Sequence, residues 1–349
     1  MKKTILATLA IASMMSCSNE ELLEAPAQQA ITFGNTFVEK APATRAAYDG
    51  SYTTSSLTQF QVYGTITNTS RESGRVFTGQ KVKKNTDGTW TLDGATQYWI
   101  PGNTYNFWGI ADGNVDGATS VDAPEELKYV PQTITVDASQ QKDVLLATRT
   151  FENYQTTDGT VVEFTFRHLM AKAKFTVKNT VSTNNDYNYV VSDIKIKTDK
   201  NGIYDVASGK WSLAKVEKTE DNLYYLSFGD ALVDIDKEGT ADGVDPAVIG
   251  FNSKAESNFE RLLIPNDYLA PGSKNLTVTF TCVTRIGTTV LRSETKEVTT
   301  QKDVVLEKGK AYNFIISLGN PGEKIQFTVT EVKDWETNHE GYNPGVEIK

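Results

Sequence analysis

Residues that could carry out catalysis are few in this chain of 349 residues. Its two histidines, His168 and His339, leave a histidine-based zinc site or a Ser-His-Asp triad without the side chains that it needs. The motifs H-E-x-x-H, G-x-S-x-G and G-x-G-x-x-G are all missing from the sequence. His168 lies beside an alternating strand, where a hydrogen-bonded core or interface histidine is the favoured interpretation. We therefore predict a protein that is not an enzyme and that uses no cofactor.

One acidic segment approximates the ligand spacing of a calcium loop. Its carboxylates belong to Asp234, Asp236, Glu238, Asp242 and Asp245. Gly239 stands at the sixth position of the loop, but the flanking sequences are not helical and an aspartate replaces the usual bidentate glutamate. Calcium is thus a weak candidate. We predict no metal site here and expect a solvated acidic loop.

The first residues have the organisation of an export leader. Lys2 and Lys3 form a positive region, residues 5–12 form a short apolar stretch, and residues 1–16 end before Cys17. The tetrapeptide MMSC resembles a lipobox, in which signal peptidase II cuts before a cysteine that is acylated on its thiol. An ordinary signal peptide with an incidental cysteine is the alternative. The other cysteine, Cys282, is expected to be a small buried core residue.

An acidic run follows the lipobox-like cysteine directly. It consists of Ser18, Asn19, Glu20 and Glu21. This run resembles the signal that sends some lipoproteins through the outer membrane to the cell surface, although a solvated tether is the alternative. A multiply acylated cysteine holds a protein stably on a membrane. The expected location is therefore the outer membrane, with the protein exposed at the cell surface.

The rest of the sequence indicates an all-β fold. Helical periodicity is almost absent, whereas apolar residues alternate in segments such as Val162, Phe164 and Phe166, and Gly, Asn, Asp and Pro bound these segments. This pattern predicts antiparallel β-sandwiches, and the polar stretch 150–160 is the candidate boundary between them. We expect an N-terminal sandwich over residues 46–152 and a C-terminal sandwich over residues 153–349.

Charge argues against one class of partner. The formal net charge is −9, and lysine and arginine are interspersed with acidic residues along the chain. No stretch builds a basic patch that could follow a phosphate backbone, so we expect no binding to nucleic acid.

The segment after the tether has the pattern of a removable strand. Ile31, Phe33 and Phe37 lie at alternating positions, so residues 31–38 can form a strand with an apolar face turned inward. Removal of such a strand leaves unpaired N–H and C=O groups beside an apolar groove. A strand from a second subunit could fill this groove, and repetition of that step would give an open-ended filament.

The C-terminal segment 338–349 is a candidate donor of that strand. Tyr342, Val346 and Ile348 fall on one parity, and Pro344 shares it. Because a proline cannot donate to a β-ladder, only part of the segment is expected to pair continuously. A frayed surface tail is the alternative.

Seven strings follow one another in order along most of the chain. They begin at Ile31 (ITFG), Ser56 (SLTQFQVYGT), Tyr105 (YNFWGIA), Gln141 (QKDVLLA), Phe164 (FTFRHLMAKAKFTV), Asn201 (NGIYDVASGKW) and Lys308 (KGKAYNFIISL). Together these strings resemble the fimbrillin family, the lipoprotein pilins of type V fimbriae of certain Gram-negative anaerobes. The resemblance implies two transthyretin-like antiparallel β-sandwich domains in tandem, exported as a lipoprotein precursor acylated at Cys17. It also implies strand exchange between fimbrial subunits after a trypsin-like protease cuts between Arg45 and Ala46.

The sequence around that bond supports processing on physical grounds as well. Residues 40–47 read KAPATRAA, with small residues and a proline around Arg45. Such an exposed segment suits a protease, and the lipidated tether with its removable strand would then comprise residues 17–45. An ordinary linker is the alternative.

The sequence thus predicts a structural subunit of a surface fimbria, polymerised with copies of itself or with other fimbrial subunits and supporting adhesion. The alternative is a monomeric surface lipoprotein or tip adhesin that binds glycans or host or bacterial surface ligands. Tryptophans could form a glycan platform, although core packing is their more usual role in strands. They are Trp90, Trp99, Trp108, Trp211 and Trp335.

Overall fold

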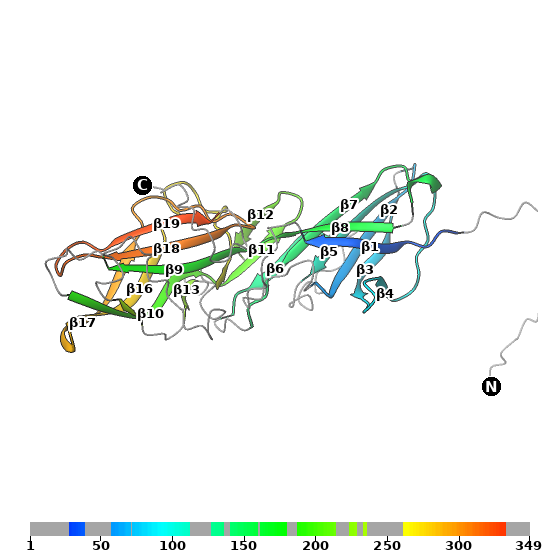
Figure 1. Ribbon diagram of the computed structural model, residues 1–349. Helices are drawn as coiled ribbons and strands as arrows, with labels where there is room; N and C mark the ends of the chain where they lie inside the picture. Colours follow the sequence, from blue (N-terminus) through cyan, green and yellow to red (C-terminus); the bar gives the residue numbers. More distant parts are fainter. Residues whose placement is uncertain are drawn as a thin grey trace, which may run out of the picture.

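The structure is a computed structural model, shown in Figure 1, and it describes ten segments of the chain. These are residues 28–38, 57–70, 72–111, 127–135, 140–159, 161–179, 187–213, 223–228, 233–235 and 261–332. Strands dominate them, and helical structure among the described residues is limited to Gln140 and the 3-10 turn η2 (Thr156–Asp158). None of these residues forms a helix long and apolar enough to span a membrane. The prediction of an all-β fold is confirmed.

Seven strands form the sheet of the N-terminal half, in the order β1-β8-β7-β5-β2-β3-β4. They are β1 (Thr32–Val38), β2 (Gln59–Thr67), β3 (Ser73–Lys84), β4 (Trp90–Asp93), β5 (Thr104–Ala111), β7 (Leu145–Phe151) and β8 (Val161–His168). The edge strands β1 and β4 lie next to each other, so the sheet curls around one apolar core. Aromatic rings from β2, β3, β5 and β8 fill this core, including Phe60, Phe77, Phe107, Phe164 and Phe166.

Three further sheets surround a second core in the C-terminal half. One contains β13 (Leu223–Ser227), β10 (Tyr187–Asp199), β16 (Thr277–Ile286), β17 (Thr289–Thr299) and β14 (Val233–Ile235). Another contains β15 (Arg261–Leu263), β9 (Ala171–Asn179), β18 (Ala311–Leu318) and β19 (Gln326–Val332). The smallest contains β12 (Lys210–Leu213), β11 (Asn201–Asp205) and β6 (Tyr129–Thr133). Cys282 of β16 is 4% exposed, as expected for a core residue, and burial raises the pKa of its thiol to about 11.

Two strand pairs depart from the expected antiparallel arrangement. β1 runs parallel to β8, and β9 runs parallel to β18. In both pairs the partners are far apart in the sequence, and parallel pairing requires a long connection of this kind. The fold is therefore all-β but mixed in strand direction.

Sheet membership also differs from the predicted boundary at residues 150–160. β8 follows this segment and still lies in the seven-stranded sheet, so the chain changes sheets between His168 and Ala171. The segment packs on the N-terminal core, because Tyr154 is fully buried and its ring stacks on Trp99 at a centroid distance of 4.2 Å. In addition, β6 precedes residue 152 yet pairs with β11 of the C-terminal half.

A buried polar pair holds the chain where it passes between the two halves. Nδ1 of His168 shares a hydrogen bond with the carboxylate of Asp143, and both side chains are buried. The next residue, Leu169, donates its N–H to the carbonyl of Val144 at 2.9 Å and accepts a bond from the indole of Trp211 at 2.8 Å. The crossover is thus fixed from both sides, and His168 is a hydrogen-bonded core residue.

Candidate functional site: strand β1 and its groove

Strand β1 lies at one edge of the seven-stranded sheet, and its ladder runs along β8. Thr32 pairs with Val161 and Gly34 pairs with Glu163. Just before β1, the N–H of Ile31 donates to the carbonyl of Gln97 at 2.8 Å, on the side away from β8. β1 therefore lies between β8 and the loop that leads into β5, and Figure 1 shows it beside β8.

The inward face of β1 is apolar at its start. Ile31 is 3% exposed and Phe33 is 6% exposed, as their alternation predicts. The ring of Phe33 lies 5.6 Å from that of Phe77, 6.0 Å from that of Phe60 and 6.2 Å from that of Phe164. Phe33 thus joins rings from three other strands into one cluster.

A β-bulge changes the parity in the middle of β1. The register shifts between Gly34 and Phe37, and beyond the shift the buried residues are Thr36 and Val38. The alternation in the sequence predicts Phe37 on the same inward face as Ile31, and this prediction does not allow for the extra residue of the bulge. The side chain of Phe37 itself lies outside the described part of the structure.

Gly34 allows a close approach between β1 and β8. A β-carbon at this position would lie 2.9 Å from Cγ1 of Val161, which is shorter than real contacts of this kind. Any larger residue would have to displace the side chain of Val161, which is 43% exposed. Gly34 therefore marks a fixed point in the register of β1 on β8.

Residues that the sequence did not single out hold the entry of β1. The hydroxyl of Tyr154 lies 3.0 Å from Oε1 of Gln29 and 2.9 Å from the carbonyl of Gly159. Burial raises the pKa of the Tyr154 hydroxyl, so it stays protonated at neutral pH. The available signal was an aromatic residue inside a polar turn segment, where a tyrosine usually has a packing role.

The chemistry of this site is the binding of a strand. Without β1, the N–H and C=O groups of β8 that pair with β1 would lose their partners. The same change would uncover apolar side chains, among them Val162, Phe60 and Phe164. A groove with a bare strand edge and an apolar floor is suited to another extended segment.

Many of the predicted site residues lie outside the described residues. These are Cys17, Ser18, Asn19, Glu20, Glu21, Arg45, Ala46, Tyr342, Val346 and Ile348. In the calcium candidate, Asp234 belongs to β14 and pairs with Val190 of β10. The other four carboxylate residues lie outside the described residues; they are Asp236, Glu238, Asp242 and Asp245. Among the residues that the structure describes, no group of three or more His, Cys, Asp or Glu could hold a metal.

Two of the tryptophans that could have formed a glycan platform are core residues. Trp99 is 4% exposed and Trp211 is 2% exposed. Trp90 and Trp108 are half-buried, and Trp335 lies outside the described residues. The buried pair cannot contribute to a surface platform.

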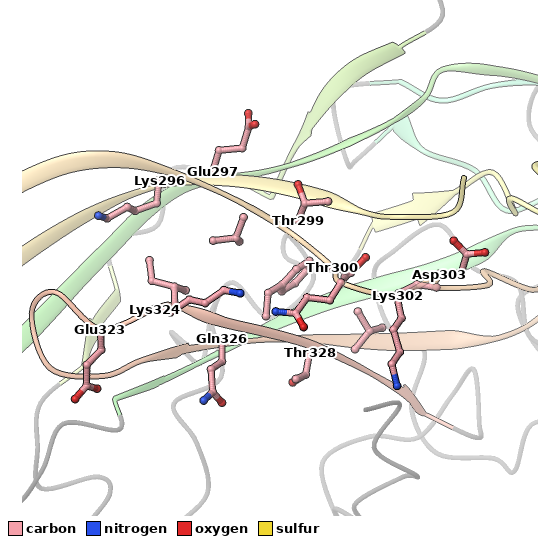
Figure 2. A pocket seen from close by; sticks show the side chains of 16 residues that line it. Lys296, Glu297, Thr299, Thr300, Lys302, Asp303, Glu323, Lys324, Gln326 and Thr328 are labelled. Atoms are coloured by element: carbon pink, nitrogen blue, oxygen red, sulfur yellow. The ribbon is translucent and has the colours of Figure 1, made fainter. Parts of the chain in front are cut away.

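A groove of about 680 Å³ lies in the C-terminal half, between strands β17 and β19 (Figure 2). Both are the last strands of their sheets, so the groove separates two sheet edges. Lysines and glutamates surround it, so charges of both signs line the groove. Figure 2 shows Lys324 extending across it while Glu297 and Glu323 point away. It contains neither histidine nor cysteine, and this lining provides no catalytic group of the nucleophile–base kind.

A family model described as fimbrillin-like matches residues 44–335. The chain belongs to the fimbrillin-like family. The resemblance seen in the sequence is thereby confirmed, and β1 precedes the matched range. The family is one of fimbrial structural and adhesion proteins and not of enzymes, so the prediction that the chain is not an enzyme is also confirmed.

Solved structures share the fold of this fimbrillin-like chain. A fimbrial protein from Bacteroides vulgatus has a TM-score of 0.54 at 11% identity, with 87% of this chain and 99% of that chain covered. A candidate cell adhesion protein from Parabacteroides distasonis has a TM-score of 0.52 at 10% identity, with coverages of 89% and 99%. A search for relatives among curated proteins found no match. Family and fold together identify a fimbrial or adhesion subunit of the cell surface, which assembles with other fimbrial subunits.

Proposed function

We propose that this fimbrillin-like protein is a structural subunit of a surface fimbria that polymerises by exchanging β1 for a strand of a neighbouring subunit. The observation that carries the proposal is the position of β1: it is the first of the described strands, it lies at a sheet edge, and it fills an apolar groove. Because the six other strands of its sheet all follow β1, one cut between Val38 and Gln59 separates it covalently from them.

Arg45 lies within that connection, and a trypsin-like protease would cut after it. Cys17 and the acidic run from Ser18 to Glu21 lie on the same side of this bond as β1. We propose that Cys17 is acylated and that the run directs export to the outer surface. A single cut would then free the groove and release the subunit from its lipid anchor. A chain that stays uncut would suit the anchor subunit of a fimbria.

The replacement strand is proposed to be the tail of another subunit, residues 338–349. Its apolar residues Tyr342, Val346 and Ile348 would enter the groove that β1 leaves. Each subunit would offer a tail at one site and a groove at another, so the contact is heterologous and the polymer open-ended. Adhesion to host or bacterial surfaces would be a property of the assembled fimbria.

The test is limited digestion of the purified precursor with a trypsin-like protease that cuts after arginine only, because Lys40 lies in the same connection. We expect a cut after Arg45 by mass spectrometry and, with it, a ladder of polymers on gels run without boiling. The matched control is Arg45→Gln, which should keep β1 covalently attached and stay monomeric. A wild-type chain that is cut after Arg45 and stays monomeric would contradict the proposal.

Exposed aromatic residues clustered on one loop face, with residues 31–38 absent from the sheet, would favour the alternative of a monomeric tip adhesin. Residues 32–38 pair with β8 instead, and this pairing supports the exchangeable strand.

A further inference from the structure

We infer that the tail enters the β1 groove in one register, parallel to β8, with Gly345 in the place of Gly34. This inference rests on the proposed function, because it specifies how the tail of one subunit would occupy the groove of the next. It follows from three constraints that the β1 site imposes on any occupant.

The first constraint is steric. At the position of Gly34, a β-carbon would lie 2.9 Å from Cγ1 of Val161, so a glycine is the residue that fits there without displacing this side chain. The tail contains Gly345 three residues after Tyr342, as β1 has Gly34 three residues after Ile31. Matching the two glycines therefore places Tyr342 at the site of Ile31 and Pro344 at the site of Phe33.

The second constraint is the direction of the backbone N–H groups. The N–H of Ile31 points away from β8, since it donates to the carbonyl of Gln97. N–H groups alternate sides along a strand, so the N–H at the position of Phe33 also points away from β8. Pro344 at that site costs no bond in the ladder with β8. The proline that seemed to interrupt pairing is thus compatible with a continuous strand.

The third constraint excludes the neighbouring registers. A shift of two residues in one direction places Pro344 at Ile31, where the bond to Gln97 would be lost. A shift of two residues in the other direction places Asn343 at Gly34, where its β-carbon would meet Val161. Shifts of one residue turn the apolar side chains out of the groove.

Beyond the glycine, the tail fits as a regular strand without the bulge of β1. Val346 then takes the buried site of Thr36, and Ile348 takes that of Val38, opposite Phe166. Glu347 faces outward, opposite the exposed Thr165. All four inward positions are then apolar.

The register also explains why cleavage must come first. Phe33 contacts three aromatic rings, and the smaller Pro344 would leave part of that space empty. β1 therefore fills the groove better than the tail, and it has the advantage of being in the same chain. The tail is expected to enter only a groove from which β1 has been cut.

The test measures the initial rate of polymerisation of the full chain after protease treatment. We expect Gly345→Ala to lower this rate at least tenfold, and Val161→Ala in the same chain to restore it to within about twofold of the unmodified chain. Gly341→Ala is the matched control, a glycine of the same tail outside the paired residues, and it should polymerise normally. Val161→Ala should not rescue Tyr342→Ala, which excludes a general loosening of the groove.

Disulfide formation between subunits tests directly which residues of the tail and of β8 lie opposite each other. Glu347→Cys combined with Thr165→Cys should give cross-linked polymers, whereas Glu347→Cys combined with Glu163→Cys or Arg167→Cys should not. Normal polymerisation of Gly345→Ala, no rescue by Val161→Ala, or cross-linking at position 163 or 167 would overturn the register while leaving strand exchange standing. Absence of polymer from the unmodified chain after cleavage would overturn both.

Discussion

The N–H of Ile31 donates to the carbonyl of Gln97 at 2.8 Å, on the side of the strand away from β8. Trp99 donates to the carbonyl of Gln29 at 2.9 Å on this same side, and Thr32 pairs with Val161 of β8 on the other, so the start of β1 is bonded on both sides. Such an edge strand is well held in the intact chain and becomes replaceable once it is no longer covalently attached.

Phe33→Ala should destabilise the uncut chain by about 3–5 kcal/mol, because it leaves a cavity among three aromatic rings. Urea unfolding monitored by tryptophan fluorescence measures the change. Thr32→Ala is the control on the exposed face of the same strand, with an expected effect within about 0.5 kcal/mol. Equal effects of the two variants would contradict the buried position of Phe33.

Gly34→Ala should destabilise the uncut chain by about 0.5–1.5 kcal/mol, because its β-carbon displaces the Val161 side chain from its rotamer. The double variant with Val161→Ala should lose less free energy of unfolding than the two single variants lose together, because alanine at position 161 lacks the overlapping methyl group. Chemical denaturation of the four chains of this cycle measures the coupling. Additive effects would show that the strands do not approach each other at this point.

How far the sequence predicts this fold depends on the regularity of each strand. The alternation in β8 identified Val162, Phe164 and Phe166 as one buried face, and all three are fully buried. The bulge in β1 was not predictable, because it arises from contact with a strand distant in the sequence. The pairing of β6 with β11 and the parallel direction of β1 were not predictable for the same reason. For the groove, sequence alternation indicated Ile31 and Phe33, whereas Gly34, Gln97 and Tyr154 required the tertiary contacts.

His168→Ala should destabilise the chain by about 1–3 kcal/mol, because it leaves the buried carboxylate of Asp143 without this hydrogen bond. The control is Lys83→Ala, which removes an ion pair with Asp93 whose side chains are 54% and 60% exposed. Its effect should be within about 1 kcal/mol. Denaturation midpoints of the two variants compare the pairs, and equal values would contradict the structural role of His168 at the crossover.

The thiol of Cys282 should resist alkylation in the folded chain. Burial raises its pKa to about 11, so at pH 9 it stays protonated in the folded state while the unfolded state begins to ionise. The buried, protonated thiol therefore makes its full contribution to the free energy of unfolding below pH 9, and this contribution is lost as the pH rises toward 11. Iodoacetamide labelling at pH 9, with and without urea, measures this difference in a Cys17→Ser chain. Equal labelling rates would contradict the burial of the thiol.

In the proposed assembly, β1 must leave its groove before subunits can join, and a covalent lock on β1 would prevent this. Thr32 pairs with Val161, and both are exposed, so Thr32→Cys combined with Val161→Cys can form a disulfide between β1 and β8 in a Cys17→Ser chain. After cleavage at Arg45, the oxidised chain should stay monomeric, and adding a reductant should start polymerisation. Polymers that form while this disulfide is intact would contradict the proposed assembly.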